Sequence, residues 1–199
     1  MDIEEFRAKH RKIFVPVVRK QTGEFLAELV KTEKPSRILE FGTAVGLSTI
    51  IMLKANTAAT LDTIELDETR ANEARKNIAA EGLGDRANVI TGDALEQAKK
   101  LAEGNKKYDL IFLDSSKGQY PKLLPYIIRL LAGGGTLVAD DVLFFGYVMG
   151  EPPKKHRSST YRLREFIEAA TTAEELENVQ ILDMENGVLV AKRKKTNEN

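Results

Sequence analysis

Acidic residues stand at the ends of five short apolar segments, each of which is typical of a buried strand. They are Glu40, Glu65 with Asp67, Asp93, Asp114, and Asp140 with Asp141. In open α/β sheets, ligands bind beyond the carboxyl ends of the strands, so this pattern predicts a binding edge. Aspartate is also a favoured N-cap, and capping of the following helix is the alternative explanation for some of these acids. Asp140 and Asp141 precede an apolar run rather than an obvious helix, which favours a ligand-binding role there.

The fourth and fifth of these segments carry the sharpest chemical pattern. Asp114 and Lys117 follow one expected strand, and Asp140 and Asp141 follow its expected neighbour. Three carboxylates that converge in one cleft repel each other unless they are protonated or neutralised. Oxygen ligands alone suit Mg²⁺, with Mn²⁺ or Ca²⁺ as alternatives. Lys117 is placed to act as a general base if a cation and burial lower its pKa, and the alternative is a simple counter-ion.

A glycine loop, residues 40–48, follows the first expected strand. Gly42 and Gly46 let the backbone turn tightly and approach a ligand, and the next helix directs its positive end toward it. The loop lacks the third glycine of dinucleotide-binding sites, which speaks against a NAD-binding dehydrogenase, and alone it could be a simple turn. Glu65 lies about 20 residues beyond Gly46, where a ribose-binding carboxylate is expected. Asp93 is placed either to reach an adenine or to cap a helix.

Composition excludes several other kinds of chemistry. The chain has no cysteine, which excludes disulfides, iron–sulfur clusters, thiolate zinc sites and cysteine nucleophiles. Its two histidines argue against a histidine-rich transition-metal site. Thirty basic and thirty acidic residues give a formal net charge of +0, which argues against a globally basic nucleic-acid binder. No apolar leader and no run of membrane-spanning length is visible. We therefore expect a cytoplasmic protein with no membrane partner.

Alternating strand and helix patterns must position these residues. Strands are expected at 37–41, 60–66, 88–91, 108–113, 136–139, 179–182 and 188–191, and helices at 47–54, 68–80, 94–102, 119–131 and 161–170, after two N-terminal helices. The glycines at 133–135 are expected to end the helix before the fifth strand, and Asn186 with Gly187 to turn a final hairpin. The pattern predicts an α/β, doubly wound, Rossmann-like fold, with seven mostly parallel strands and an antiparallel C-terminal hairpin.

The expected organisation is a single domain over residues 1–199. It divides into N-terminal helices at 1–34, a Rossmann-like core at 35–193 and a tail at 194–199. The basic segment from Lys192 onward is expected to be a frayed end.

Five motifs together resemble a known family. ILEFGTAVGLST, TIELD, VITGDAL, YDLIFLDSSKGQY and GGGTLVADDVLFFGYV resemble class I S-adenosylmethionine-dependent methyltransferases. More narrowly, they resemble the metal-dependent O-methyltransferases related to catechol and caffeoyl-CoA O-methyltransferases. The resemblance runs from about Val15 to Arg193. The first three motifs are shared by many methyltransferases, whereas Asp114 and Lys117 together with Asp140 and Asp141 are more specific to this branch.

The resemblance implies two cofactors, S-adenosylmethionine and a divalent cation, with Mg²⁺ as the first expectation. The residues implied to bind S-adenosylmethionine are Glu40, Gly42, Thr43, Ala44, Gly46 and Ser48 around the methionine end, Glu65 at the ribose, Asp93 and Ala94 at the adenine, and Asp114. Asp114, Asp140 and Asp141 are implied metal ligands, and Lys117 is the implied general base. The family usually has Asp-Asn where this chain has Asp140 and Asp141. The third carboxylate would either bind the cation more tightly or not ligate it. A homodimer is a further expectation of the resemblance.

The methyl acceptor is expected to be a catechol-like or other small hydroxylated molecule. Short bacterial members that the chain resembles include tRNA 5-hydroxyuridine methyltransferases, so tRNA is the alternative acceptor. The basic run at 154–164 could hold phosphates of RNA or coenzyme A, or be a solvated face. Phe144, Phe145 and Tyr147 could stack on a base or a phenol, or pack in the core or a dimer interface. A NAD-binding dehydrogenase and a non-catalytic adenosyl-binding module are the less favoured functions.

Overall fold

The computed structural model describes residues 1–12 and 15–195. The chain forms two compact units, Met1–Asp93 and Ala94–Asn199, and each has its own helices and strands. Among the described residues, no helix combines the length and the apolar character that crossing a membrane requires.

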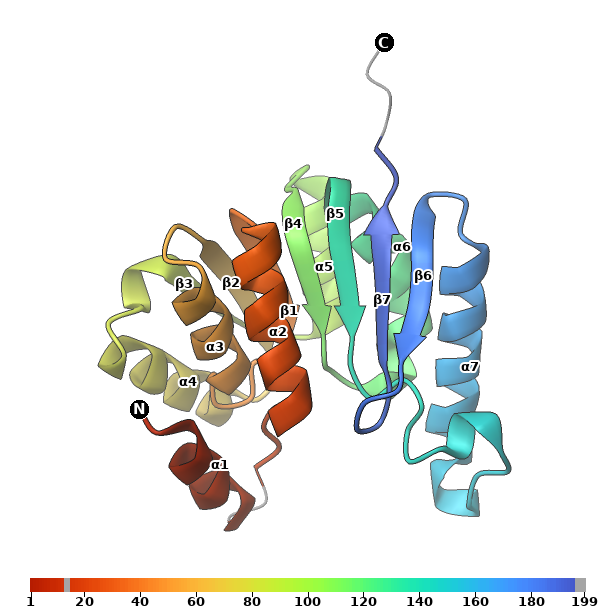
Figure 1. The fold of residues 1–199 in the computed structure, drawn as a ribbon, viewed down its shortest axis with the longest axis horizontal. Helices are drawn as coiled ribbons and strands as arrows, with labels where there is room; N and C mark the ends of the chain where they lie inside the picture. Colours follow the sequence, from red (N-terminus) through yellow and green to blue (C-terminus); the bar gives the residue numbers. More distant parts are fainter. Residues whose placement is uncertain (13–14, 196–199) are drawn as a thin grey trace. The chain divides into compact units, whose positions relative to one another are not determined.

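The first unit contains three parallel strands in the order β3-β2-β1 (Figure 1). Its strands are β1 (Arg37–Phe41), β2 (Thr60–Glu65) and β3 (Ala87–Thr91), and its helices are α1 (Ile3–Lys12), α2 (Lys20–Glu33), α3 (Leu47–Ala55) and α4 (Glu68–Ala80), with a 3₁₀ turn at Gly84–Arg86. Strand β1 is buried over four of its five residues, as expected of a strand covered on both faces. Asp67 caps α4 by accepting the amide of Arg70, so the capping interpretation holds for this acid.

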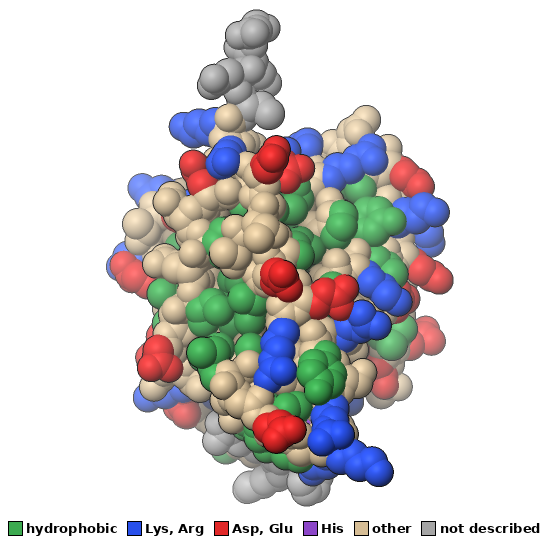
Figure 2. All heavy atoms as spheres, turned by 90° about the vertical axis from the view of Figure 1, so that its right-hand side faces the viewer, with side chains coloured by type: hydrophobic (Ala, Val, Ile, Leu, Met, Phe, Trp, Pro, Cys, Tyr) green, Lys and Arg blue, Asp and Glu red, His purple; other side chains and the backbone are tan. Residues whose placement is uncertain are grey.

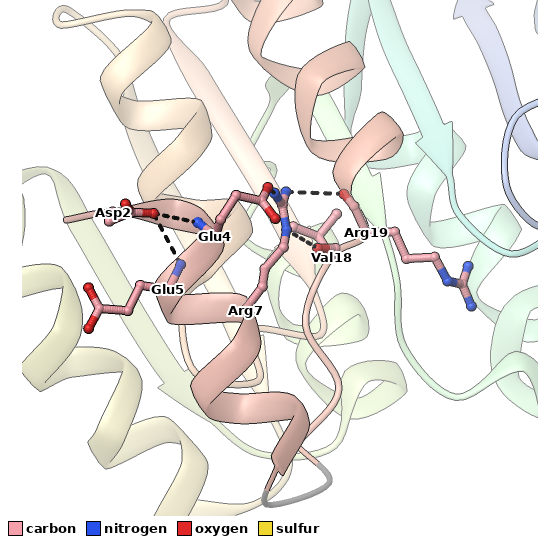
Figure 3. Close-up of polar contacts among 6 residues, drawn as sticks. All are labelled: Asp2, Glu4, Glu5, Arg7, Val18 and Arg19. Atoms are coloured by element: carbon pink, nitrogen blue, oxygen red, sulfur yellow. Dashed lines mark hydrogen bonds and ion pairs between the residues drawn. The ribbon is translucent and has the colours of Figure 1, made fainter.

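The buried Arg7 ties α1 to the segment that leads into α2 (Figure 3). Its Nε donates to the carbonyl of Val18 at 3.1 Å, and its Nη2 donates to that of Arg19 at 3.3 Å. Gly23 on α2 leaves room for the guanidinium, because a Cβ there would lie 2.7 Å from Nη2. Glu4 neutralises the charge through an ion pair of 2.7 Å. These contacts satisfy a buried cation and fix the first helix on its unit.

The second unit contains four strands in the order β4-β5-β7-β6. Its strands are β4 (Tyr108–Leu113), β5 (Leu131–Ala139), β6 (Leu176–Leu182) and β7 (Val188–Arg193), its helices are α5 (Ala94–Glu103), α6 (Tyr120–Leu130) and α7 (Arg157–Thr172), and its 3₁₀ turns are η2 (Lys117–Gln119), η3 (Tyr147–Met149) and η4 (Lys154–His156). Strands β4 and β5 are parallel, whereas β7 runs antiparallel to both β5 and β6. Helix α6 packs between α5 and α7 (Figure 1).

The predicted fold class is confirmed, including the antiparallel C-terminal hairpin. Two local predictions are wrong. The glycines at 133–135 do not stop a helix but lie within β5, where a Cβ on Gly135 would come 3.1 Å from the carbonyl oxygens of Tyr108 and Asp109 on β4. The segment from Lys192 is not frayed at its start, because β7 runs to Arg193 and the Nζ of Lys192 donates to Thr136 at 2.6 Å. Residues 196–199 of the expected tail lie outside the described residues.

Candidate active site

Three carboxylates meet at the ends of β4 and β5. Asp114 follows β4, and Asp140 and Asp141 follow β5. The parallel register pairs Leu113 with Ala139, so the next residues along both strands are neighbours, and the amide of Asp140 donates to the carbonyl of Leu113 at 3.0 Å. Each acid offers one carboxylate oxygen, and the three oxygens lie within 4.8 Å of one another. The predicted metal-ligand residues are therefore brought together.

Burial makes this cluster electrostatically costly. Asp140 is only 2% exposed. Burial, followed by the charges of Asp114 and Asp141, raises the pKa of Asp140 from 3.8 to about 7. Asp140 therefore ionises less readily than an ordinary aspartate, and positive charge placed beside it would oppose this effect.

Lys117 supplies one positive charge at the rim of the cluster. Its Nζ lies 2.9 Å from Oδ1 of Asp114 and 3.8 Å from Oδ2 of Asp141. Burial opposes its charge, but attraction to Asp114, Tyr120 and Asp141 outweighs burial and raises the pKa of Lys117 above its ordinary value. Without a cation Lys117 is therefore a protonated counter-ion. Its predicted role as a base requires a lower pKa and stays a prediction.

Tyr120, the first residue of α6, completes the polar network, although the sequence alone predicts no role for it. Lys117 Nζ donates to the Tyr120 hydroxyl at 2.8 Å. The hydroxyl in turn faces the carbonyls of Leu113 at 3.0 Å and Asp140 at 3.2 Å. The signal in the sequence is the spacing of Lys117 and Tyr120, which places both on one side of a helical turn.

The segment after Asp141 is held in an uncommon backbone conformation. Asp141, Phe144 and Phe145 have positive φ angles of 59°, 45° and 58°, which are rare for aromatic residues in particular. The β6–β7 hairpin holds this segment, because the amides of residues 142 and 143 donate to the carbonyls of Gly187 and Asn186 at 3.0 and 2.8 Å. Gly187 itself has a φ of 80°, and a Cβ there would lie 2.4 Å from Leu143. The turn predicted at Asn186 and Gly187 therefore supports the chain next to the metal-ligand candidates.

An aromatic group follows the acidic cluster. The ring centroid of Phe144 lies 5.3 Å from that of His156 and 5.5 Å from that of Phe145. Tyr147 stacks on His156, with the two ring centroids 5.5 Å apart. Phe145 is 61% exposed, so part of the group faces solvent. Arg164 on α7 holds the segment by donating to three of its carbonyls, including that of Val148 at 2.9 Å.

The basic run at 154–164 is divided between internal and exposed positions. Arg164 is used within the unit, and Arg162 pairs with Glu165 at 2.7 Å. Lys154, Lys155 and Arg157 are exposed where α7 begins. Figure 2 views the side of the molecule that bears α7, where basic, acidic and apolar side chains are interspersed. Some basic residues of the run therefore bond within the unit, and others are exposed.

The glycine loop of the first unit is pre-shaped. Gly42, Ala44 and Gly46 have positive φ angles of 100°, 47° and 89°. Glu65 accepts the amide of Ala44 at 2.8 Å through one oxygen and that of Asp67 at 3.0 Å through the other. A carboxylate has further lone pairs, so these two bonds leave acceptor capacity for a ligand. Glu65 therefore fixes the loop as well as standing where a ribose-binding carboxylate was predicted.

Glu40 belongs to a buried hydroxyl network under this loop. Its side chain is fully buried and accepts hydrogen bonds from Thr49 on α3 and, at 2.6 Å, from Thr63 on β2. The hydroxyl of Thr63 also lies 2.5 Å from that of Thr43. The network links β1, β2, α3 and the loop, so it fixes the position of Thr43.

The remaining predicted cofactor residues differ in exposure. Gly42, Ala44, Asp93 and Ala94 are partly exposed, whereas Gly46 and Ser48 are buried. Asp93 ends the first unit, and Ala94 begins both the second unit and α5. The contacts of these residues, and of Asp114, with a cofactor stay predictions.

Comparisons with known proteins identify the family of the chain. The family model described as O-methyltransferase matches residues 2–194. The chain is 34% identical over 135 residues to a catechol O-methyltransferase of Mycobacterium tuberculosis (67% of this chain, 60% of the relative) and 37% identical over 131 residues to one of Niastella koreensis (65% and 59%). The chain thus spans about three fifths of the length of these relatives.

Solved structures share the fold over nearly the whole chain. An O-methyltransferase from Bacillus cereus in complex with SAH has a TM-score of 0.86 at 27% identity, covering 96% of this chain and 90% of that one. Cofactor-bound Rv0187 from MTB has a TM-score of 0.83 at 26% identity, covering 95% and 88%.

Proposed function

Because the chain belongs to the O-methyltransferase family, we propose that it transfers a methyl group from S-adenosylmethionine to the hydroxyl oxygen of a catechol-like or other small hydroxylated acceptor, with a divalent cation. One observation carries the proposal: three carboxylates from neighbouring strands converge within 4.8 Å beside a largely buried lysine. Two relatives named catechol O-methyltransferase support the acceptor class.

The residues present fit a hard divalent cation. The cluster offers only oxygen ligands, which suits Mg²⁺ first and Mn²⁺ or Ca²⁺ as alternatives. The raised pKa of Asp140, caused by burial and by Asp114 and Asp141, reflects a repulsion that a bound cation would relieve. Asp114, Asp140 and Asp141 would hold the ion. Asp141→Asn tests whether Asp141 is a ligand.

The chemistry follows from charge. The sulfonium of S-adenosylmethionine loses its positive charge as the methyl group moves to oxygen, so the acceptor reacts best as an oxyanion. A divalent cation supplies the Lewis acidity that lowers the pKa of a hydroxyl group. Lys117, 2.9 Å from Asp114, lies at the rim of this cluster. We assign the acceptor's proton to its Nζ, which can take it only once added positive charge has lowered the lysine pKa.

Most of the residues assigned to the methyl donor lie in the first unit. The loop at 42–46 and the positive end of α3 suit close approach of a ligand, and Glu65 has acceptor capacity for ribose hydroxyls. The SAH bound in the structure from Bacillus cereus supports this cofactor. Asp93 and Ala94 are assigned to the adenine.

A tRNA acceptor is less well supported. Arg162 and Arg164 are engaged within the second unit, which leaves fewer cations of the basic run for phosphates. The relatives compared above are named for catechol rather than for RNA. Salt separates the two acceptors, since RNA binding weakens steeply with salt and binding of a neutral phenol does not.

The direct test is methyl transfer from labelled S-adenosylmethionine to catechol, with Mg²⁺ present. Asp114→Ala should abolish transfer and weaken Mg²⁺ binding while S-adenosylmethionine still binds. Asp183→Ala, at an exposed acid of the same unit, is the matched control and should change neither. Equal transfer by Asp114→Ala and the unchanged chain would contradict the proposal. Methylation of tRNA nucleosides but of no phenol would show that the acceptor is tRNA rather than a small hydroxylated molecule.

A further inference from the structure

We propose that Tyr120 is a positioning residue of this site, whose hydroxyl holds Lys117 against the acidic cluster and joins the ends of β4 and β5. The inference rests on the proposed function, because it assigns Tyr120 a part in cation binding and methyl transfer. It adds a residue that acts through Lys117 and Asp140 rather than by touching the acceptor.

The Tyr120 hydroxyl makes three polar contacts with parts of the chain that bear on the cluster. It receives a hydrogen bond from Lys117 Nζ at 2.8 Å. Its own proton is shared between the carbonyls of Leu113 at 3.0 Å and Asp140 at 3.2 Å. Leu113 is the last residue of β4 before Asp114, and Asp140 is itself a ligand candidate. One oxygen atom therefore links both strand ends and the lysine.

Among the described residues, the Tyr120 hydroxyl makes no hydrogen bonds other than those to Lys117, Leu113 and Asp140. The side chain is fully buried, and its ring packs edge-on against Phe166 of α7 with centroids 5.2 Å apart. A buried phenol hydroxyl is costly unless it is hydrogen-bonded, and a phenylalanine would fill the same apolar space without that cost. The hydroxyl is thus explained by what it holds rather than by packing.

Lys117 needs such a restraint. Its side chain has a flexible four-carbon stem, and the two carboxylates at 2.9 and 3.8 Å both attract its ammonium. The Tyr120 hydroxyl and ring also hold the ammonium, with Nζ 2.8 Å from the hydroxyl and 4.9 Å from the ring centroid. Without the hydroxyl, Lys117 would move farther among the carboxylates and compete with a cation for them.

Tyr120→Phe tests the inference, with Tyr126→Phe on the same helix as the control. Tyr120→Phe should weaken Mg²⁺ binding by about 10-fold and lower kcat by about 10- to 100-fold, the range for a lost hydrogen bond to a charged group. The KM for S-adenosylmethionine should not change. Because Tyr120 acts through Lys117, adding Tyr120→Phe to Lys117→Met should lower kcat by much less than it does alone. Tyr126→Phe should match the unchanged chain.

The outcomes separate this inference from the proposed function. If the unchanged chain binds no Mg²⁺ and transfers no methyl group, the proposed function fails. If it does both and Tyr120→Phe equals it in Mg²⁺ affinity and kcat, the inference is overturned. A lower Tm with unchanged Mg²⁺ affinity and kcat also overturns it, since that is a purely structural role. If Tyr120→Phe does not fold, Lys117→Met carries the test, and unchanged kcat and Mg²⁺ affinity in that variant overturn the inference.

Discussion

Asp141→Asn is expected to stabilise the protein without a cation and to weaken its binding of one. Asn keeps the shape of the side chain and tolerates the positive φ of 59° at this position, so the change is almost purely one of charge. The charge is attracted to Lys117 at 3.8 Å and repelled by two carboxylates whose ligand oxygens lie within 4.8 Å. The sign of the effect depends on which of these interactions is larger.

Coulomb's law gives the magnitude. With an effective dielectric constant near 20, each repulsion at 4.8 Å is about 3 kcal/mol and the attraction at 3.8 Å is about 4 kcal/mol. Two repulsions exceed one attraction by about 2 kcal/mol, and partial exposure of Asp141 reduces the net gain to about 1 kcal/mol. For a chain of this length, that gain corresponds to a Tm rise of about 2–4 °C. Loss of one ligand charge should weaken Mg²⁺ binding by about 10- to 100-fold.

Thermal unfolding with a chelator and calorimetric titration with Mg²⁺ measure the two effects. Both are best done near pH 8, roughly one unit above the pKa of Asp140, so that the Asp140 carboxyl is ionised. Asp183→Asn, at an exposed position of the same unit, is the control. A lower Tm together with unchanged Mg²⁺ affinity would refute the reasoning, because Asp141 would then be only a structural partner of Lys117.

Three further outcomes follow from the structure. Burial and the neighbouring carboxylates raise the pKa of Asp140 to about 7, so Mg²⁺ affinity measured by calorimetry should increase with pH and level off above about pH 7. Without a cation, the contribution of Asp140 to the stability of the protein should fall as pH rises from about 4 to 7. Asp140→Asn should remove this pH dependence of thermal unfolding. Glu65→Ala should weaken S-adenosylmethionine binding by about 10-fold or more, because it removes a carboxylate that holds the amide of Ala44, while Mg²⁺ affinity stays the same; equal affinity for the cofactor would contradict the assignment of the loop. Gly187→Ala should destabilise the protein by about 2 kcal/mol or more in denaturant titration, because the new Cβ would clash with Leu143 and the alanine would have to keep a positive φ. A change below about 0.5 kcal/mol would show that the hairpin does not hold the segment after Asp141.

The pattern of apolar residues in the sequence was enough to predict the positions of several strands. Strands β1 and β4 lie where the apolar runs at 37–41 and 108–113 predicted them. The acidic cluster was also predictable, because the carboxyl ends of parallel neighbours share an edge and each of the two strands is followed by aspartate. Local chemistry and topology point to the same residues there.

Other features depend on contacts that spacing does not reveal. The glycines at 133–135 have the composition of a helix stop, and only the close approach of β4 shows why Gly135 lies within a strand. Helix α7 begins at Arg157 rather than at 161, so part of the basic run is helical. The sequence alone predicts no role for Tyr120, because spacing does not reveal that carbonyls from two different strands meet its hydroxyl. The homodimer and the acceptor stay predictions.

Cation-dependent methyl transfer is the measurement that tests the account most directly. The purified protein is incubated with S-adenosylmethionine and catechol, first with a chelator and then with Mg²⁺ in excess of it, and the methylated product is quantified. The three converging carboxylates predict no product with the chelator and full recovery with Mg²⁺. Product formed at the same rate with and without the chelator would contradict the account.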